Sequence, residues 1–377
     1  MSKTLDVIVA GLGAFGSAAV YHLARRGCAV LGLDRFTPPH TNGSHHGRTR
    51  IIREAYFEHP GYVPMVQQAF RSWRELEREA GEPLLQRTGG LMVGVPDGLL
   101  VPGARKSARA HNLPYEELSA ADLRRRFPAL HPADGMQVLF EPRAGILFPE
   151  TCVRAHLEGA LKAGADLHFE EPVTRWEPDG EGVRVHTPRG SHTAGSLVLA
   201  AGAWLARLLP DFPLPLEVER QVVYWFEPIT RADFTPERCP IFIIEHARER
   251  YVYGFPDLGE GVKIALHHEG EVTDPECVNR EVGAEETAST RELVQRFVPG
   301  AAGTLRDASV CLYTNTPDGH FIVDFHPDCP QVLLASSCSG HGFKFAGILG
   351  EAAAGLLTEK RARTDLSMFR VSRLSRS

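Results

Sequence analysis

A chain of 377 residues, 43% of them hydrophobic, is long enough for one large or two medium domains with a substantial core. Its formal net charge of -6 argues against a nucleic-acid partner, because phosphate binding needs clustered positive charge. No stretch approaches the roughly 20 consecutive apolar residues of a membrane-spanning helix, so we expect no membrane partner.

The cysteines and the N-terminal residues indicate the compartment. Seven cysteines are scattered along the chain without any Cys-x-x-Cys pair, which suits a reducing environment and argues against disulfides and a zinc site. The first apolar run is broken by glycines at 11–16, and no cleavage signal follows it. We therefore expect a cytoplasmic protein, with no metal site, whose first apolar run is a strand rather than an export signal.

Residues 6–34 have the pattern of one βαβ unit. A β-branched run at 6–10 predicts a buried strand, residues 17–27 predict a helix ending at a glycine, and residues 28–34 predict a second strand. The sequence Gly-Leu-Gly-Ala-Phe-Gly at 11–16 joins the first strand to the helix.

This glycine turn is typical of a dinucleotide site. Gly11 permits the tight turn, Gly13 lets the backbone approach a pyrophosphate, and Gly16 packs the helix against the strand. Asp34 ends the second strand, where an acid binds ribose hydroxyls. A structural glycine turn is the alternative, but the strand, the helix and the acid in this order favour the nucleotide site.

A basic segment follows at residues 43–53, with the sequence Gly-Ser-His-His-Gly-Arg-Thr-Arg-Ile-Ile-Arg. Burying this much positive charge is costly unless anions pair with it, so a solvated loop is one interpretation. The apolar pair at 51–52 instead indicates that the segment packs on a core. Planar guanidinium groups, as at Arg50 and Arg53, suit bidentate capture of a carboxylate.

The middle of the chain is mainly scaffold. Apolar spacing predicts a helix within 58–81, a strand at 89–95, a surface helix at 118–128, a helix at 151–164 and a strand at 166–173. Residues 196–204 then predict a strand and a tight turn of small residues that contains Gly202. This turn is either a second backbone approach to a cofactor or a close-packed corner between strand and helix.

Residues 216–300 alternate predicted strands with Pro/Gly turns, which indicates an antiparallel sheet beside a substrate. In the strand at 261–267, Lys263 and His267 share one face because side chains alternate along a strand. On an exposed face the pair would be unremarkable; facing inward, it would bring a cation and an imidazole into a site.

The C-terminal part has two unusual segments. Residues 311–318 read Cys-Leu-Tyr-Thr-Asn-Thr-Pro-Asp, and residues 339–344 read Ser-Gly-His-Gly-Phe-Lys before a predicted helix. Taken alone, Cys311 is most simply a buried structural thiol, and the second segment is a helix-capping loop. Glycines at a helix start also bring N–H groups and positive dipole toward an anionic ligand.

In combination these motifs resemble the monomeric sarcosine oxidase family of flavin amine oxidases. The resemblance is carried by residues 11–16, 43–53, 311–318 and 339–344 and extends over nearly the whole chain. It implies FAD as the cofactor, joined covalently to the sulfur of Cys311. It also implies a monomer that acts on a small amino acid and dioxygen.

The resemblance implies roles for individual residues. Arg53 and Lys344 bind the substrate carboxylate, Arg50 lies over the flavin, and Lys263 activates dioxygen. The other implied residues line the substrate cavity (His267, Tyr253, Tyr313) or the cofactor site (Gly11, Gly13, Gly16, Asp34, Ser44, His46, Val173, Gly202, Gly340, Gly342). Arg48 and Glu54 depart from the family stretch, where aspartate and histidine are common.

The expected fold is α/β, a glutathione-reductase-like Rossmann domain for FAD interleaved with an antiparallel-sheet substrate domain. We assign residues 1–85, 145–215 and 305–377 to the FAD domain, and residues 86–144 and 216–304 to the substrate domain.

The expected reaction is oxidation of a secondary amino acid, such as sarcosine or another N-methyl amino acid, by dioxygen. An imine forms and is hydrolysed to an aldehyde and an amine, with release of hydrogen peroxide. A cyclic imino acid such as pipecolate or proline, or a glycated amino acid, is the alternative substrate. An FAD dehydrogenase with another electron acceptor, or an NAD-dependent dehydrogenase sharing the glycine fingerprint, is the alternative class.

Overall fold

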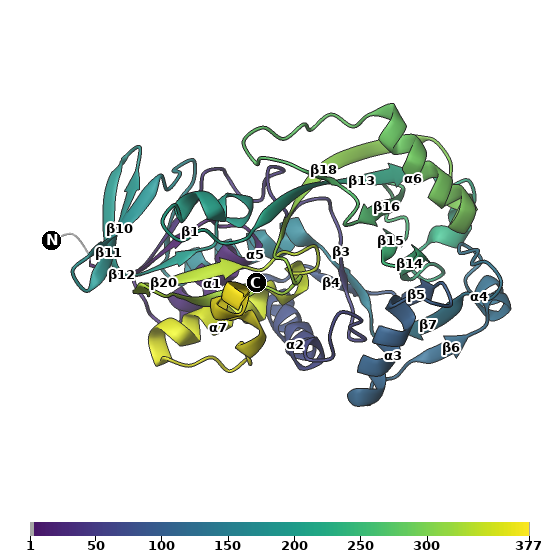
Figure 1. Ribbon diagram of the computed structural model, residues 1–377, viewed down its shortest axis with the longest axis horizontal. Helices are drawn as coiled ribbons and strands as arrows, with labels where there is room; N and C mark the ends of the chain where they lie inside the picture. Colours follow the sequence, from purple (N-terminus) through teal and green to yellow (C-terminus); the bar gives the residue numbers. More distant parts are fainter. Residues whose placement is uncertain (1–3, 377) are drawn as a thin grey trace.

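The computed structural model describes residues 4–376 as two large sheets that lie side by side along the long axis (Figure 1). The eight strands of the first sheet are β1 (Leu5–Ala10), β2 (Val30–Leu33), β9 (Asp166–His168), β10 (Arg175–Asp179), β11 (Gly182–Thr187), β12 (Gly190–Leu199), β19 (Ile322–His326) and β20 (Cys329–Ser336). Parallel pairing joins β20, β12, β1, β2 and β9, in register at Val7 with both Val30 and Ser196.

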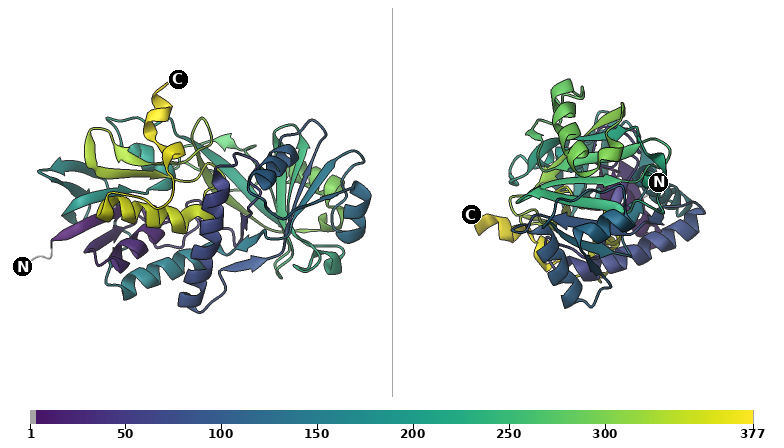
Figure 2. Two further views of the ribbon diagram at one scale, coloured as in Figure 1. Left: turned by 90° about the horizontal axis from the view of Figure 1, so that it is seen from below. Right: turned by 90° about the vertical axis from the view of Figure 1, so that its right-hand side faces the viewer.

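Strand β2 and residues 7–10 of β1, at the centre of the parallel strands, are buried on both faces, as their continuous apolar sequences require. Three helices, α1 (Ala14–Arg25), α5 (Pro149–Lys162) and α7 (Ala346–Glu359), cover one face, where Val7, Val9 and Val198 join their core (Figure 2). The other face packs Ile8 and Leu31 against Val185 of the β10–β11 hairpin. The C-terminal ends of β1 and β2 therefore present the glycine turn and Asp34 at one edge of a rigid sheet.

The second sheet has nine strands, β17-β13-β16-β15-β14-β5-β7-β6 in spatial order, with β18 paired to β13. Their bounds are β5 (Gly90–Gly94), β6 (Glu116–Leu118), β7 (Gln137–Glu141), β13 (Glu217–Phe226), β14 (Ile241–Ala247), β15 (Arg250–Phe255), β16 (Val262–His267), β17 (Glu271–Val272) and β18 (Leu305–Asn315). All pairs are antiparallel except β5 with β14. This sheet has its own core, which includes Phe226, Phe242 and Ile264.

A small sheet of β3 (Arg50–Ile52), β8 (Gly145–Leu147) and β4 (Leu85–Arg87) completes the strands. The other helices are α2 (Tyr62–Ala80), α3 (Leu100–Ala110), α4 (Ala120–Arg126) and α6 (Ala284–Phe297), with 3-10 turns at Gly202–Leu208, Arg231–Phe234, Pro299–Ala301, Phe343–Phe345, Ser367–Phe369 and Val371–Arg376. Over the described residues, no helix combines the length and apolar character that crossing a bilayer requires.

The predicted fold class is confirmed, and the differences are local. The strand predicted at 166–173 ends at His168, because the chain turns at Glu170, whose φ is +55°. The predicted division at residue 305 falls at the start of β18, which pairs with β13 along its length. The chain returns to the first sheet with β19. The assignment of domains by residue range stays a prediction.

Candidate active site

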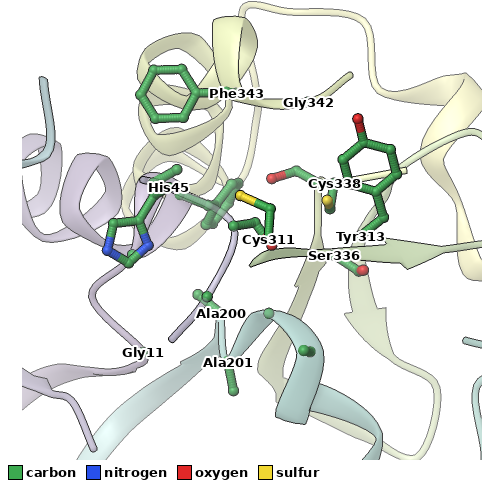
Figure 3. Close-up of a pocket in the computed structure, with 18 of the residues that line it drawn as sticks. Gly11, His45, Ala200, Ala201, Cys311, Tyr313, Ser336, Cys338, Gly342 and Phe343 are labelled. Carbon is green, nitrogen blue, oxygen red and sulfur yellow. The ribbon is translucent and has the colours of Figure 1, made fainter. Parts of the chain in front are cut away.

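A cavity of about 580 Å³ is lined by residues of both large sheets and of the loops between them. Figure 3 shows residues from its wall, contributed by the turn at Gly11, the turn at Ala200, the strand carrying Cys311 and Tyr313, and the loop at Gly342. The cavity thus brings together motifs that are up to about three hundred residues apart in the sequence.

At the glycine turn, the backbone packs too closely for any side chain. Gly11 has φ +93°, and a Cβ there would lie 2.5 Å from the Ala200 carbonyl oxygen. A Cβ at Gly16 would lie 1.7 Å from the Gly11 carbonyl oxygen. The Asp34 carboxylate accepts from Leu12 N at 2.6 Å, and burial raises its pKa to about 6 despite this hydrogen bond. These contacts explain why the turn needs glycine and how Asp34 is held.

The Cys311 thiol is buried among basic groups. Arg50 Nη2 lies 3.2 Å and His46 Nε2 3.5 Å from Sγ. Burial opposes ionisation, but Arg50, His46 and Lys263 outweigh it and lower the pKa of Cys311 to about 6. A thiolate is the reactive form of cysteine, so this thiol is activated for nucleophilic attack.

Arg50 is held in place by the backbone of its own loop. Its guanidinium donates to Thr49 O at 2.8 Å and to Ser44 O at 2.9 Å. The Ser44 hydroxyl in turn donates to the carbonyl of Leu312, the residue next to Cys311. The basic loop is therefore fastened to β18, which fixes the guanidinium beside the sulfur.

Lys263 lies behind the cavity wall, 2% exposed. Its Nζ donates to Gly47 O at 2.6 Å, Thr49 O at 2.8 Å and Thr49 Oγ1 at 3.1 Å. Burial lowers the pKa of Lys263 well below its ordinary value, and Arg50 lowers it further. The three acceptors match the three N–H groups of an ammonium. Hydrogen bonds to the charged form favour it, so these contacts act to raise the pKa of Lys263.

Arg53 and Lys344 line the cavity as a second pair of cations. Arg53 Nη2 donates to both carboxylate oxygens of Glu58 at 2.7 Å, and Lys344 Nζ donates to His341 O at 2.6 Å and Tyr56 Oη at 3.3 Å. Burial and then Arg53 lower the pKa of Lys344 to about 7, while Glu58 opposes the shift. Two cations share one acid, so a second carboxylate would be attracted here.

Aromatic rings and an imidazole form the wall beside these cations. His267 Nδ1 lies 3.2 Å from Tyr313 Oη, and the Tyr253 and His267 ring centroids are 6.2 Å apart. Burial lowers the pKa of His267 well below its ordinary value, so the ring is neutral at neutral pH. The wall is therefore apolar with hydroxyl and imidazole atoms at its surface, which suits a small organic substrate.

The structure brings nearly all of the predicted site residues to one place. Those that line the cavity are Gly11, Gly13, Asp34, Ser44, Arg50, Arg53, Val173, Gly202, Tyr253, His267, Cys311, Tyr313, Gly340, Gly342 and Lys344. Among the residues described, Gly16, His46 and Lys263 lie behind the wall: Gly16 against Gly11, His46 against Cys311, and Lys263 against the basic loop. Their roles stay predictions.

Three polar partners were missed by the sequence analysis. Glu58 pairs with Arg53, His341 contacts Tyr56 Oη through Nδ1 at 2.7 Å, and Glu150 accepts from Arg48 N at 2.9 Å. Glu58 had a local signal, an acid five residues after a basic group, and His341 lies in the segment 339–344, although the sequence analysis gave it no role. Glu150 is brought to the site by tertiary packing alone.

Arg48 does not add net charge to the cavity. Its guanidinium pairs with Asp307 at 2.5 Å and Glu260 at 3.3 Å, and it lies over the Trp225 ring at 4.3 Å. The positive charge that distinguishes this position from the family stretch is thus neutralised within the protein. Glu54, the other departure, is buried and 3.4 Å from Arg143.

Residues 6–356 match the family model described as FAD dependent oxidoreductase. The chain belongs to this family. The FAD-dependent oxidoreductases most similar in sequence include the monomeric sarcosine oxidase of Streptomyces avermitilis, 45% identical over 100% of this chain and 99% of the relative. The N-methyl-L-tryptophan oxidase of Yersinia pestis is 35% identical over 98% of this chain and 99% of the relative.

Solved structures of amino acid oxidases share the fold. NikD, an amino acid oxidase essential for nikkomycin biosynthesis, superposes with a TM-score of 0.87 at 24% identity, covering 98% of each chain. Glycine oxidase from Geobacillus kaustophilus superposes with a TM-score of 0.83 at 20% identity, covering 100% of each. At these sequence identities, the structural similarity shows a shared fold alone.

The residues present fit FAD. Gly11 and Gly16 permit the close-packed turn of a dinucleotide fingerprint, Asp34 lies at the strand end where a ribose binds, and Cys311 lies on the same cavity. An NAD-dependent dehydrogenase, the alternative class, would need none of the chemistry assembled around Cys311.

Proposed function

We propose that this enzyme oxidises an N-methyl amino acid at its C–N bond, using FAD and dioxygen, and releases hydrogen peroxide. The observation that carries this proposal is the buried pair Arg53 and Lys344 on the wall of the FAD cavity, two cations that both contact Tyr56. A buried pair of cations is costly unless an anion joins it. Glu58 already pairs with Arg53 and supplies one anion, and an amino acid carboxylate supplies a second.

The protein's own groups bind and orient the substrate. FAD, when bound, accepts the two electrons removed from the substrate C–N bond. Arg53 and Lys344 hold the carboxylate by charge-assisted hydrogen bonds. The neutral ring of His267, beside Tyr313, leaves the amine without a competing positive charge. The fixed carboxylate thereby aligns the C–N bond with the rest of the cavity.

The relatives favour an N-methyl amino acid over the other candidates. Those at 35–45% identity are named for sarcosine and N-methyl-L-tryptophan. Structures named for L-proline and for fructosyl amines are only 20–21% identical and share the fold alone. A cyclic imino acid, a glycated amino acid or an acceptor other than dioxygen stays the alternative.

A substrate screen tests the function. Purified holoenzyme is mixed anaerobically with sarcosine, N-methyl-L-tryptophan, pipecolate, L-proline and a fructosyl amino acid, and flavin absorbance is followed. We expect bleaching by an N-methyl amino acid, and one peroxide per substrate oxidised under air. Bleaching by the cyclic or glycated compounds alone, or bleaching without peroxide, would establish one of the alternatives.

Replacement of either carboxylate-binding cation is expected to weaken substrate binding. Charge-assisted hydrogen bonds contribute about 1.5–3 kcal/mol each, so Arg53→Met or Lys344→Met should weaken binding at least about tenfold. Flavin content should stay intact. The exposed Lys162→Met is the matched control. Saturation curves that coincide with the wild type for both variants would count against the assignment.

Binding of a carboxylate should depend on pH through Lys344. The pKa of Lys344 is lowered to about 7, so its ammonium form is lost as pH rises through 7. Affinity for acetate, a simple carboxylate probe, should therefore fall by up to about tenfold per pH unit above about 7. Acetate titrations followed by the flavin spectrum, at pH values from 6 to 9, measure this affinity. Lys344→Met should remove the dependence, and a flat wild-type profile would contradict it.

Two properties outside the site are also proposed. We infer a monomer, as the name of the most similar sarcosine oxidases states for those proteins. All seven cysteines of the sequence are free thiols, consistent with the reducing environment of the cytoplasm. Sedimentation and cell fractionation measure these two properties.

A further inference from the structure

A cluster of two histidines and a buried acid lies outside the active site, in the first sheet. Glu171 is 1% exposed and receives a histidine nitrogen on each carboxylate oxygen. His168 Nδ1 is 2.9 Å from Oε2, and His192 Nε2 is 3.1 Å from Oε1. The three potential ligand atoms lie within 4.8 Å of one another.

We propose that His168, Glu171 and His192 bind a divalent transition metal of the Zn²⁺ class. Two imidazoles and one carboxylate, with water in a fourth position, are a donor set that zinc accepts. Ligand atoms about 2.0–2.1 Å from a tetrahedral zinc are about 3.3 Å apart. The two histidine nitrogens lie 2.9 and 3.1 Å from the Glu171 carboxylate, each from a different one of its oxygens, which is within a few tenths of an ångström of that separation.

The groups around the cluster orient its members as the outer groups of a metal site do. The second nitrogen of His168, Nε2, lies 3.3 Å from Asp166 Oδ2, the carboxylate–histidine arrangement typical of zinc ligands. The Thr187 hydroxyl donates to Glu171 Oε1 at 2.7 Å and fixes the carboxylate. These contacts fix the orientation of the His168 ring, with Nδ1 toward Glu171.

An ion can reach the site from solvent. The side chains of His168 and His192 are 32% and 26% exposed, so their outer edges face water. Arg189 Nη1 lies 3.3 Å from Glu171 Oε2 and competes for this carboxylate, and its Nη2 donates to the carbonyl oxygens of Phe169 and Glu170 at 3.3 Å, but its side chain is 58% exposed. A metal ion that binds Glu171 displaces this guanidinium toward solvent.

The position of the cluster links it to the nucleotide end of the active site. Asp34 N donates to His168 O at 3.0 Å, and Glu171 N donates to Asp34 O at 2.8 Å. A metal held by His168 and Glu171 would therefore stabilise the turn that is hydrogen-bonded to the backbone of Asp34. We expect metal binding to raise the melting temperature of the holoenzyme.

Metal titration tests this inference without using activity. Holoenzyme carrying Cys277→Ala, which removes an exposed thiol, is titrated with Zn²⁺ by calorimetry and with Co²⁺ by visible absorption. We expect one ion per chain, tetrahedral Co²⁺ bands and a higher melting temperature than in EDTA. His168→Ala and His192→Gln should abolish binding at concentrations that saturate the parent, and Asp166→Asn should weaken it about 10–100-fold.

The matched control is His186→Ala. His186 also pairs with an acid in the same sheet, through Nε2 at 2.9 Å from Glu177, but belongs to no such cluster. It should bind metal like the parent. The inference is overturned if the parent binds no Zn²⁺, or if the cluster variants, with unchanged circular dichroism and flavin content, bind it as the control does.

Discussion

Lys263→Met is expected to slow oxidation of the reduced enzyme by dioxygen about a hundredfold or more, with far less change in anaerobic reduction by substrate. Dioxygen becomes anionic as it accepts the first electron, and a fixed cation stabilises that charge. Substrate oxidation creates no comparable anion. The three oxygen acceptors around Nζ hold the Lys263 side chain in position before dioxygen arrives.

Stopped-flow absorbance separates the two half-reactions. Substrate is mixed with enzyme without oxygen in one experiment, and reduced enzyme is mixed with oxygenated buffer in the other. Methionine preserves the length of the buried side chain, and circular dichroism checks the fold. The exposed Lys162→Met should behave as the wild type. Normal reoxidation in Lys263→Met, or an equal loss in both half-reactions, would refute the role.

Cys311→Ala is expected to convert a covalently held flavin into a dissociable one. The pKa of Cys311 is lowered to about 6, so the thiolate needed to form a thioether is the main species at neutral pH. Acid precipitation of the wild type should give a yellow pellet, and precipitation of the variant a colourless pellet with free FAD in the supernatant.

The exposed Cys277→Ala is the control for this experiment and should leave the flavin in the pellet. Arg50→Met should slow the attachment, because Arg50 is the group that lowers the pKa of Cys311 most. A wild-type pellet without colour would contradict a covalent bond, while leaving the reaction assigned to Arg53 and Lys344 untouched.

The nucleotide fingerprint could be predicted from the sequence because its determinants are local. Gly11 has a positive φ and Gly16 packs against the Gly11 carbonyl within one turn, and Asp34 ends the strand that the same unit contains. Strand alternation likewise placed Lys263 and His267 on one side of β16. Turn glycines and strand alternation depend on residues a few positions away, so they can be recognised in a single sequence.

The states of the reactive groups were decided by tertiary structure. His46 and Arg50 reach Cys311 from 265 and 261 residues away, and they turn a buried thiol into an acidic one. Arg48 reads as excess charge in the sequence, yet it meets Asp307 across 259 residues. A pKa or a net local charge depends on distance and burial, so it exists only once the chain has folded.

The cluster around Glu171 shows the same division. The sequence predicted no metal site, because His168 and Glu171 form no motif until β12 brings His192 beside them. Backbone geometry and side-chain periodicity could thus be predicted from the sequence, because they depend on nearby residues. The partners that set charge, reactivity and ligand binding are brought together by packing between distant segments.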